Sequence, residues 1–251
     1  MHVVELWRHP VKSLQGERLD EARVEDSGVS GDRRWGIVDG ETGKVLTARR
    51  EPSLLLATSR LTDTGIEIRL PDGTVLMAPS VDTNDALSRW IGRPVELVPA
   101  DSVEAGVGEF FEDATDDTSP IVSWKMPPGR FVDAFALLIV TTASLRQGRV
   151  LHPEGAWETR RFRPNLVVEV DDDGWVEDGW CGRTVQVGTA ALRPATPCVR
   201  CTMVTRPQPG LDRDLDVFRA LARHHGATFG VWSAVQTPGV VRVGDTVTLT
   251  D

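Results

Sequence analysis

The chain lacks the features that define several large classes of protein. Its 251 residues contain no run of about eighteen apolar residues, so no part of it is expected to span a membrane. It has three cysteines, an odd and small number that argues against a disulfide framework and favours the reducing cytosol. Three are also too few for an iron–sulfur cluster held by four thiolates. No Gly-x-Gly-x-x-Gly turn follows a predicted strand, which argues against a bound dinucleotide.

An excess of positive charge is also missing. The 28 lysines and arginines are outnumbered by 37 aspartates and glutamates, which gives a formal net charge of −9 and argues against non-specific nucleic-acid binding. The first residues alternate like a strand and carry no signal-peptide pattern. We therefore expect a cytoplasmic protein whose length suits one large domain or two small ones.

Two of the three cysteines lie in one short stretch, residues 196–205. Arg200 lies between Cys198 and Cys201, and a neighbouring guanidinium favours the thiolate, the form in which sulfur reacts or binds a metal. The β-branched run at 202–205 predicts a strand. Cys201 is therefore expected where a loop enters a strand, a position from which a rigid scaffold can present a ligand.

The spacing of the cysteines alone leaves several functions open. The pair could be half of a zinc site, but the chain has no second pair, and Cys181 with His224 or His225 would complete the site only through the fold. A thioredoxin-like redox pair would open a helix after a buried strand, whereas a β-branched run follows here. The remaining possibility is that the two cysteines are semi-buried and only structural, and spacing alone favours this possibility.

The first region, residues 1–98, is predicted to be a small β-rich module. A strand at residues 3–8 runs into a proline turn that carries Lys12 and Ser13. An ammonium and a hydroxyl side by side are good partners for a phosphate, although most polar turns are only structural. Further along, Arg33 and Arg34 would point to opposite faces of an extended segment, so only one of them could reach a given site.

Residues 99–130 differ from the rest in composition. The acidic run at 113–120 and the Pro-Pro-Gly sequence at 127–129 predict a long loop or linker, which would be either a lid near a site or merely mobile.

The second region, residues 131–251, is predicted to be a closed β-barrel, because short strands alternate with turn signals throughout it. A buried strand at 137–140 precedes a short helix, and residues 212–224 form the best predicted helix, ended by Gly226. Arg163 and Asn165 flank a proline. In an extended segment they would project together, and an arginine fork suits phosphate and carbonyl groups.

Five motifs in order resemble the MOSC family, named after the C-terminal domain of the molybdenum-cofactor sulfurase, together with its N-terminal β-barrel partner. Each motif is weak alone, but the five in order are specific and cover nearly the whole chain. By pattern, the chain resembles most the mitochondrial amidoxime-reducing component and its bacterial counterparts. The fold implied is mainly β, with a MOSC β-barrel domain containing a few short helices and a smaller β-rich N-terminal module. The motifs are residues 10–13, 31–35, 163–165, 198–201 and the tail 229–245.

The resemblance also implies roles for individual residues. In that family the second cysteine of the motif binds molybdenum, so Cys201 would be both the metal ligand and the catalytic residue, a soft anionic donor for a metal held by a dithiolene. Trp232 stands where relatives have a tyrosine, so a hydroxyl contact is lost or replaced by an indole N–H. Ala134 and Phe135 replace small hydroxyl residues. Phosphate-holding positions correspond to Lys12, Ser13 and Arg33, and pterin-contacting positions to Arg163, Asn165 and Arg200.

The function implied is that of a molybdenum-cofactor-dependent oxidoreductase that reduces small N-hydroxylated compounds. Its electrons would come from a separate donor protein of the ferredoxin, flavin reductase or cytochrome b5 type. The alternative is a sulfur or cofactor carrier that hands on a Cys201 persulfide or the bound molybdenum cofactor (molybdopterin). A β-barrel binding module without redox turnover is the third possibility.

Overall fold

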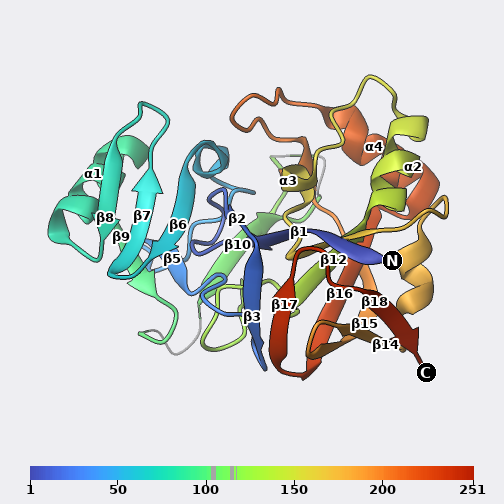
Figure 1. Cartoon of the computed structure of the whole chain (residues 1–251). Coiled ribbons are helices and arrows are strands. Elements are labelled where there is room, and N and C mark those ends of the chain that lie inside the picture. The colour runs from blue at the N-terminus through green and yellow to red at the C-terminus, as the bar shows by residue number, and fades with distance from the viewer. Residues whose placement is uncertain (103–105, 114–115, 117) are drawn as a thin grey trace.

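The computed structural model describes residues 1–102, 106–113, 116 and 118–251 of the protein, and it is mainly β (Figure 1). One large curved sheet has the strand order β18-β14-β15-β16-β12-β13-β1-β2, and four smaller sheets surround it in the described residues. The mainly β fold class is therefore confirmed. The strands of the large sheet are β1 (His2–Arg8), β2 (Glu17–Leu19), β12 (Leu137–Thr141), β13 (Leu166–Glu169), β14 (Thr184–Val187), β15 (Ala190–Val199), β16 (Thr228–Thr237) and β18 (Val247–Thr250).

The smaller sheets come mostly from the first half of the chain. They are β17-β3-β4, β6-β7-β8, β5-β9 and β10-β11. Their strands are β3 (Glu21–Glu25), β4 (Gly28–Val29), β5 (Trp35–Asp39), β6 (Thr58–Thr62), β7 (Gly65–Arg69), β8 (Val75–Ala78), β9 (Val95–Pro99), β10 (Val107–Phe111), β11 (Ile121–Lys125) and β17 (Gly239–Arg242). The helices are α1 (Val81–Ile91), α2 (Thr142–Leu151), α3 (Thr159–Phe162) and α4 (Leu215–His225), with 3₁₀ turns η1 (Pro52–Leu56), η2 (Val176–Trp180) and η3 (Thr202–Thr205).

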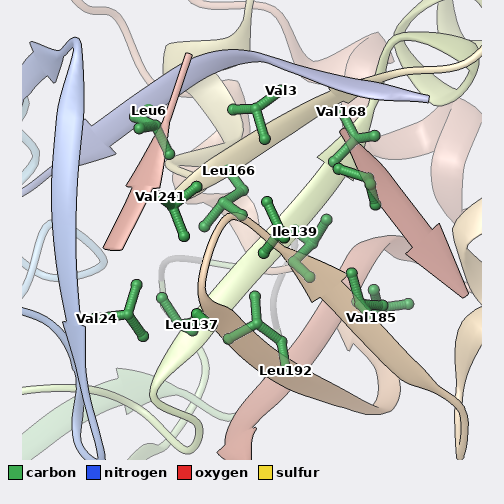
Figure 2. Packing of buried hydrophobic residues seen from close by; sticks show 14 of the residues in the cluster. Val3, Leu6, Val24, Leu137, Ile139, Leu166, Val168, Val185, Leu192 and Val241 are labelled. Carbon is green, nitrogen blue, oxygen red and sulfur yellow. The ribbon is translucent and has the colours of Figure 1, made fainter. Parts of the chain in front are cut away.

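The central strand β12 is buried on both faces, and every one of its residues is buried. Since successive side chains of a strand point to opposite faces, Leu137 and Ile139 enter one core while Leu138 and Val140 enter another. Figure 2 shows the first core, where Leu137 and Ile139 meet Leu166 and side chains from surrounding strands inside the curved sheet. The second core lies on the other side of the sheet and includes residues of α4.

The two regions of the chain share their sheets. Strand β1, drawn in dark blue in Figure 1, pairs with β13 of the second half, and β3 pairs with β17 near the C-terminus. The predicted domain boundaries at residues 98 and 131 stay a prediction. Strands β1 and β3, both from the first 25 residues, pair with strands β13 and β17 of the second region. The pairing of β1 with β13 holds the turn after β1 close to the first residues of β12 and β13.

The expectation of a closed barrel is wrong. The large sheet curls, but β18 and β2 remain its two edges, and no ladder joins them. The segment that leads into β18 instead meets β1, through an antiparallel bridge between His2 and Thr246 and backbone hydrogen bonds such as that from the Val247 N–H to the Met1 carbonyl at 2.9 Å. The physical reason is that β17 leaves the large sheet and pairs with β3 in a sheet of its own.

The predicted linker at 99–130 contains regular structure. Strands β10 and β11 form an antiparallel hairpin in which Phe111 pairs with Ile121. The aromatic and β-branched residues within 107–111 and 121–125 are the signal that the acidic composition of the connecting segment obscured. Part of that acidic run, residues 114, 115 and 117, lies outside the described residues.

The helices follow the sequence signals closely. Helix α4 begins after Asp214, whose Oδ1 accepts from the backbone N–H of Asp216 at 3.0 Å, and it ends at Gly226 in the left-handed conformation, as predicted. Thr141 caps α2 through its hydroxyl. Among the helices in the described part of the chain, none combines the length and apolar character needed to cross a membrane.

A buried carboxylate fastens β12 to η2. Glu177 is fully buried and accepts hydrogen bonds from the hydroxyls of Thr141 and Ser144 at 2.6 and 2.7 Å. Burial raises its pKa above the ordinary value, although the two hydroxyl donors oppose that shift. Between the unfolded and the folded pKa, the folded state therefore keeps a proton at Glu177 that the unfolded state has already released.

This buried acid predicts a pH dependence of stability. Because the folded pKa lies above the unfolded one, the wild type loses unfolding free energy as pH rises from the unfolded pKa of about 4 through the folded pKa. Relative to Glu177→Gln, which cannot ionise, the wild type should become progressively less stable over that range. Urea unfolding at a series of pH values measures the difference, with the exposed Glu154→Gln as the control that stays parallel to the wild type. A Glu177→Gln difference that does not change with pH would contradict the prediction.

Candidate functional site

All eight residues singled out in the sequence line one cleft of about 150 Å³ between the first region and the large sheet. Its walls are the turn after β1, the loop before β5, the segment 132–135 ahead of β12, the turn between α3 and β13, and the end of β15. The cleft thus gathers segments that are far apart in the chain. The eight residues are Lys12, Ser13, Arg33, Arg163, Asn165, Arg200, Cys201 and Trp232.

Cys201 lies at the end of a strand rather than at its start. The residues before it belong to β15, which pairs with β16 as far as Val199, and the run after it forms the 3₁₀ turn η3. The predicted strand at 202–205 is therefore wrong. Val204 is fully buried in the second core, and the hydroxyl of Thr205 donates to the carbonyl of Thr202, so tertiary packing overrides the β propensity of these residues.

Arg49 is the direct partner of Cys201. Its Nε lies 3.3 Å from the Cys201 Sγ, and its guanidinium also pairs with Asp133. Asp133 in turn accepts from the Lys12 Nζ at 2.7 Å, and Lys12 also donates to the carbonyl of Phe131 at 3.0 Å. Arg49 and Asp133 escaped the sequence analysis. A carboxylate inside the otherwise apolar segment 131–140 was the available signal for Asp133, but Arg49 stands in an ordinary polar turn.

The two cysteines of the motif differ in acidity. Burial alone would raise the pKa of Cys201, but the charge and hydrogen bond of Arg49 and the backbone N–H of Met203 outweigh it, so the pKa is lowered. Burial dominates at Cys198 and raises its pKa, even though the Arg200 Nη1 lies 3.0 Å from its sulfur. Cys201 is therefore the more acidic thiol of the pair, and Cys198 is a buried core residue that ionises less readily.

The cleft holds more positive than negative charge. Among the described residues, one carboxylate lines it, that of Asp133, against the cations of Lys12, Arg33, Arg49, Arg163 and Arg200. Arg163 is buried, and its burial together with the charge of Arg33 lowers its pKa to about 9. Such mutual repulsion favours an anion in the cleft, since a bound anion would relieve it.

Several of these cations are held in place by the protein itself. Arg33 donates to Asp32 at 2.5 Å and to the carbonyl of Arg163 at 3.2 Å. Arg163 donates to the carbonyl of Leu14 at 2.5 Å. Arg200 donates to the carbonyl of Phe162 at 2.8 Å, and its buried Nε has no partner in the described residues. That unpartnered donor, directed by a fixed guanidinium, is a contact still open to a ligand.

The remaining predicted residues have different parts in the cleft. The Ser13 hydroxyl accepts from the backbone N–H of Ala48 at 2.9 Å and keeps its own hydrogen to donate. Asn165 is committed to the fold, because its amide oxygen accepts from the Leu138 N–H at 3.2 Å and its amide nitrogen donates to the Trp7 carbonyl at 3.3 Å. Trp232 stacks on Phe135 with ring centroids 5.8 Å apart.

Two details of the predicted geometry need correction. Arg33 reaches the cleft while Arg34 donates to the Gly129 carbonyl outside it, as expected, but Arg33 is left-handed with φ 50° rather than extended. Arg163 is also left-handed, with φ 56°, because it ends α3. The 163–165 segment is therefore a helix end, which directs the two side chains differently from an extended strand.

The zinc alternative finds no support in the described part of the chain, which contains no group of three or more His, Cys, Asp and Glu side chains able to hold a metal ion. His225 instead stacks on Trp175 at 4.2 Å and lies 3.1 Å from an oxygen of Asp178.

Comparison with known domains identifies the family. Residues 1–99 match the MOSC N-terminal beta barrel domain, and residues 128–248 match the MOSC domain. The two domains together account for most of the chain, so the protein belongs to the MOSC family, as its motifs predicted.

Individual relatives match over nearly the whole chain at low identity. Mitochondrial amidoxime reducing component 2 of Macaca fascicularis is 27% identical over 98% of this chain and 82% of its own length. Human mitochondrial amidoxime-reducing component 1 is 26% identical over the same shares. A rice molybdenum cofactor sulfurase is 24% identical over 83% of this chain but only 28% of its own length. The crystal structure of the YUAD protein from Bacillus subtilis has a TM-score of 0.50 at 12% identity, covering 99% of this chain and 94% of that one, a likeness of fold alone.

The contact between Arg49 and Cys201 predicts the reactivity of the thiol. Arg49→Ala removes the charge that lowers the Cys201 pKa, so the midpoint of Cys201 alkylation by iodoacetamide should move to higher pH. Mass spectrometry of the Cys201 peptide over a pH series measures the midpoint. Arg34→Ala, which removes a neighbouring arginine outside the cleft, should leave it where it is. An unmoved midpoint in Arg49→Ala would show that the contact does not control the thiolate.

Proposed function

We propose that the protein is a molybdenum-cofactor-binding oxidoreductase that reduces N-hydroxylated compounds with electrons from a separate donor protein. One observation carries the proposal: the cleft combines Cys201, whose pKa the contact with Arg49 lowers below its ordinary value, with an excess of cationic side chains. The relatives named amidoxime-reducing components support the reaction class, and the relative named molybdenum cofactor sulfurase supports the cofactor.

The donor set of the cleft fits the proposed cofactor. A thiolate is a soft ligand suited to molybdenum, and Cys201 supplies one. The phosphate of a pterin cofactor suits a pocket with several cations, and the Ser13 hydroxyl and the unpartnered Arg200 Nε remain free to donate to such a ligand. Residues proposed to hold it are Lys12, Ser13, Arg33, Arg163, Arg200 and Cys201, with Trp232 at the edge and Asn165 fixing the backbone beneath.

Each part of the site has a distinct task in this proposal. When bound, the molybdenum cofactor would supply the two-electron redox chemistry. Arg49 keeps Cys201 ionised and oriented, and Asp133 keeps Arg49 and Lys12 in place through ion pairs. In the net reaction the N–O bond breaks, the oxygen leaves as water, and the substrate gains two electrons from the donor protein and two protons from solvent. The donor is a ferredoxin, a flavin reductase or a cytochrome b5 type protein, acting with this chain in the reducing cytosol.

The two cysteines should respond differently to substitution. Cys201→Ser replaces the thiolate by a hydroxyl that stays protonated, so the protein should lose nearly all turnover and bind molybdenum in an altered coordination. Cys198→Ser changes a buried protonated thiol and should keep most of both. Metal content, X-ray absorption at the molybdenum edge and turnover of the two variants measure the difference. Equal losses in both would point to a paired-cysteine mechanism instead.

Turnover with defined reductants tests the function itself. Protein made in a cofactor-competent host should reduce a simple amidoxime with dithionite-reduced viologen but not with NADH alone. The chain has no dinucleotide turn, and its three cysteines cannot hold a four-thiolate cluster. Turnover with NADH alone would overturn the need for a separate donor. Fully molybdenum-loaded protein that is inactive with viologen would instead favour the carrier function, in which Cys201 hands on sulfur or the cofactor.

A further inference from the structure

His9 is fully buried directly after strand β1, and it lies behind the cationic cleft rather than in its lining. Its backbone bonds to the loop before β5, because its N–H donates to the Asp32 Oδ1 and its carbonyl accepts from the Arg33 N–H, each at 2.7 Å. Its ring bonds to the turn between α3 and β13, where Nε2 lies 3.2 Å from the carbonyl oxygen of Pro164. His9 therefore joins the two turns that carry Arg33 and Arg163 into the cleft.

These two turns need support from outside, because both arginines are left-handed, with φ 50° and 56°. A residue other than glycine keeps such a conformation only where the surrounding contacts fix it. The Asp32 carboxylate that accepts from His9 also accepts from the Arg33 Nη1, and the Arg33 Nη2 donates to the Arg163 carbonyl at 3.2 Å. The two turns thus form one hydrogen-bonded unit with His9 at their junction.

The contacts of the ring define its protonation. A carbonyl can only accept, so the bond to Pro164 places the hydrogen on Nε2. Nδ1 is buried and has no hydrogen-bond partner in the described residues, and a Cβ at Gly16 would lie only 2.5 Å from it. Burial and the charges of Arg163 and Arg33 hold the pKa of His9 well below its ordinary value. The ring is therefore neutral and adds no third cation beside the two arginines.

From this geometry we propose that His9 is a positioning residue of the cationic cleft. By donating from Nε2 to the Pro164 carbonyl, the ring holds the turn of Arg163 against the turn of Arg33, so that both guanidiniums face one anion. His9 itself lines neither the anion site nor the surroundings of the Cys201 sulfur. The identification of the anion as the phosphate of a bound cofactor rests on the proposed function.

The binding test uses the full-length chain without cofactor and inorganic phosphate as the probe, measured by isothermal titration calorimetry. His9→Gln keeps an N–H donor at nearly the reach of Nε2, whereas His9→Asn is one methylene shorter and cannot reach Pro164. The Asn variant should bind phosphate about tenfold more weakly than the wild type, and the Gln variant within about twofold of it. His9→Phe, which fills the space of the ring without a donor, should bind as weakly as the Asn variant.

The matched control is His2→Phe in the same strand. The ring of His2 also bonds to the second half of the chain, since its Nε2 lies 2.7 Å from an oxygen of Glu169, but it is half exposed and outside the cleft. This variant should bind phosphate like the wild type.

Thermal unfolding of all four variants separates positioning from a loss of stability. A merely structural histidine would make phosphate affinity follow the melting temperature, whereas a positioning donor makes the affinity follow the presence of the N–H. Rescue by His9→Gln, but not by His9→Asn or His9→Phe, supports the proposal. Equal phosphate affinities in the Asn and Gln variants would overturn it, and so would a wild type that binds no phosphate.

The same variants distinguish this proposal from the reductase function. Molybdenum and pterin bound per chain, after production in a cofactor-competent host, should follow the same order as phosphate affinity. If the phosphate order holds while the loaded wild type reduces no N-hydroxylated compound, the role of His9 stands and the reductase proposal falls. If all variants bind phosphate equally while the loaded wild type reduces an amidoxime, the role of His9 is overturned and the reductase proposal stands.

Discussion

The ion pair between Arg49 and Asp133 is the interaction on which the site depends. Arg49 comes from the β-rich first half of the chain, and Asp133 from the segment that leads into the central strand β12. Asp133 would be costly to bury alone, but the charges of Arg49 and Lys12 outweigh that cost and hold its pKa far below the ordinary value. The same arginine contacts the Cys201 sulfur, so one guanidinium couples the assembly of the two halves to the state of the thiol.

This coupling explains why the pKa of Cys201 is lowered and that of Cys198 is raised, although each has an arginine partner. At Cys198 burial raises the pKa more than the attraction of Arg200 lowers it. At Cys201 the effects of Arg49, Met203 and Arg200 together lower the pKa more than burial raises it. Proximity to a cation is therefore not sufficient to make a cysteine acidic. The balance with desolvation decides, and it differs between two sulfurs three residues apart.

Much of the fold and the membership of the site could be predicted from the sequence. Periodicity located β12 and α4, and every site residue that the motifs named lines the cationic cleft. Local patterns could not reveal Arg49, because nothing in a polar turn shows that it will face a cysteine about 150 residues away. Local patterns also failed at residues 202–205, where Val204 and its neighbours follow the packing against α4 rather than their β propensity. They failed again at the β10–β11 hairpin, whose strands are joined by an acidic connection.

The placement of β1 in the large sheet has a consequence for the order of assembly. His2 pairs with Glu169, so β1 finds its neighbour β2 early but cannot pair with β13 until the chain has been made as far as Glu169. Until then the apolar side chains of β1, among them Val3 and Leu6, have no core to enter, because that core is completed by residues as late as Val247. Contacts of such long sequence separation slow folding. The turn that carries Lys12 and Ser13 follows β1 directly, and the cleft also needs Cys201 and Trp232, so a nascent chain that ends before these residues does not yet have a place for its ligand.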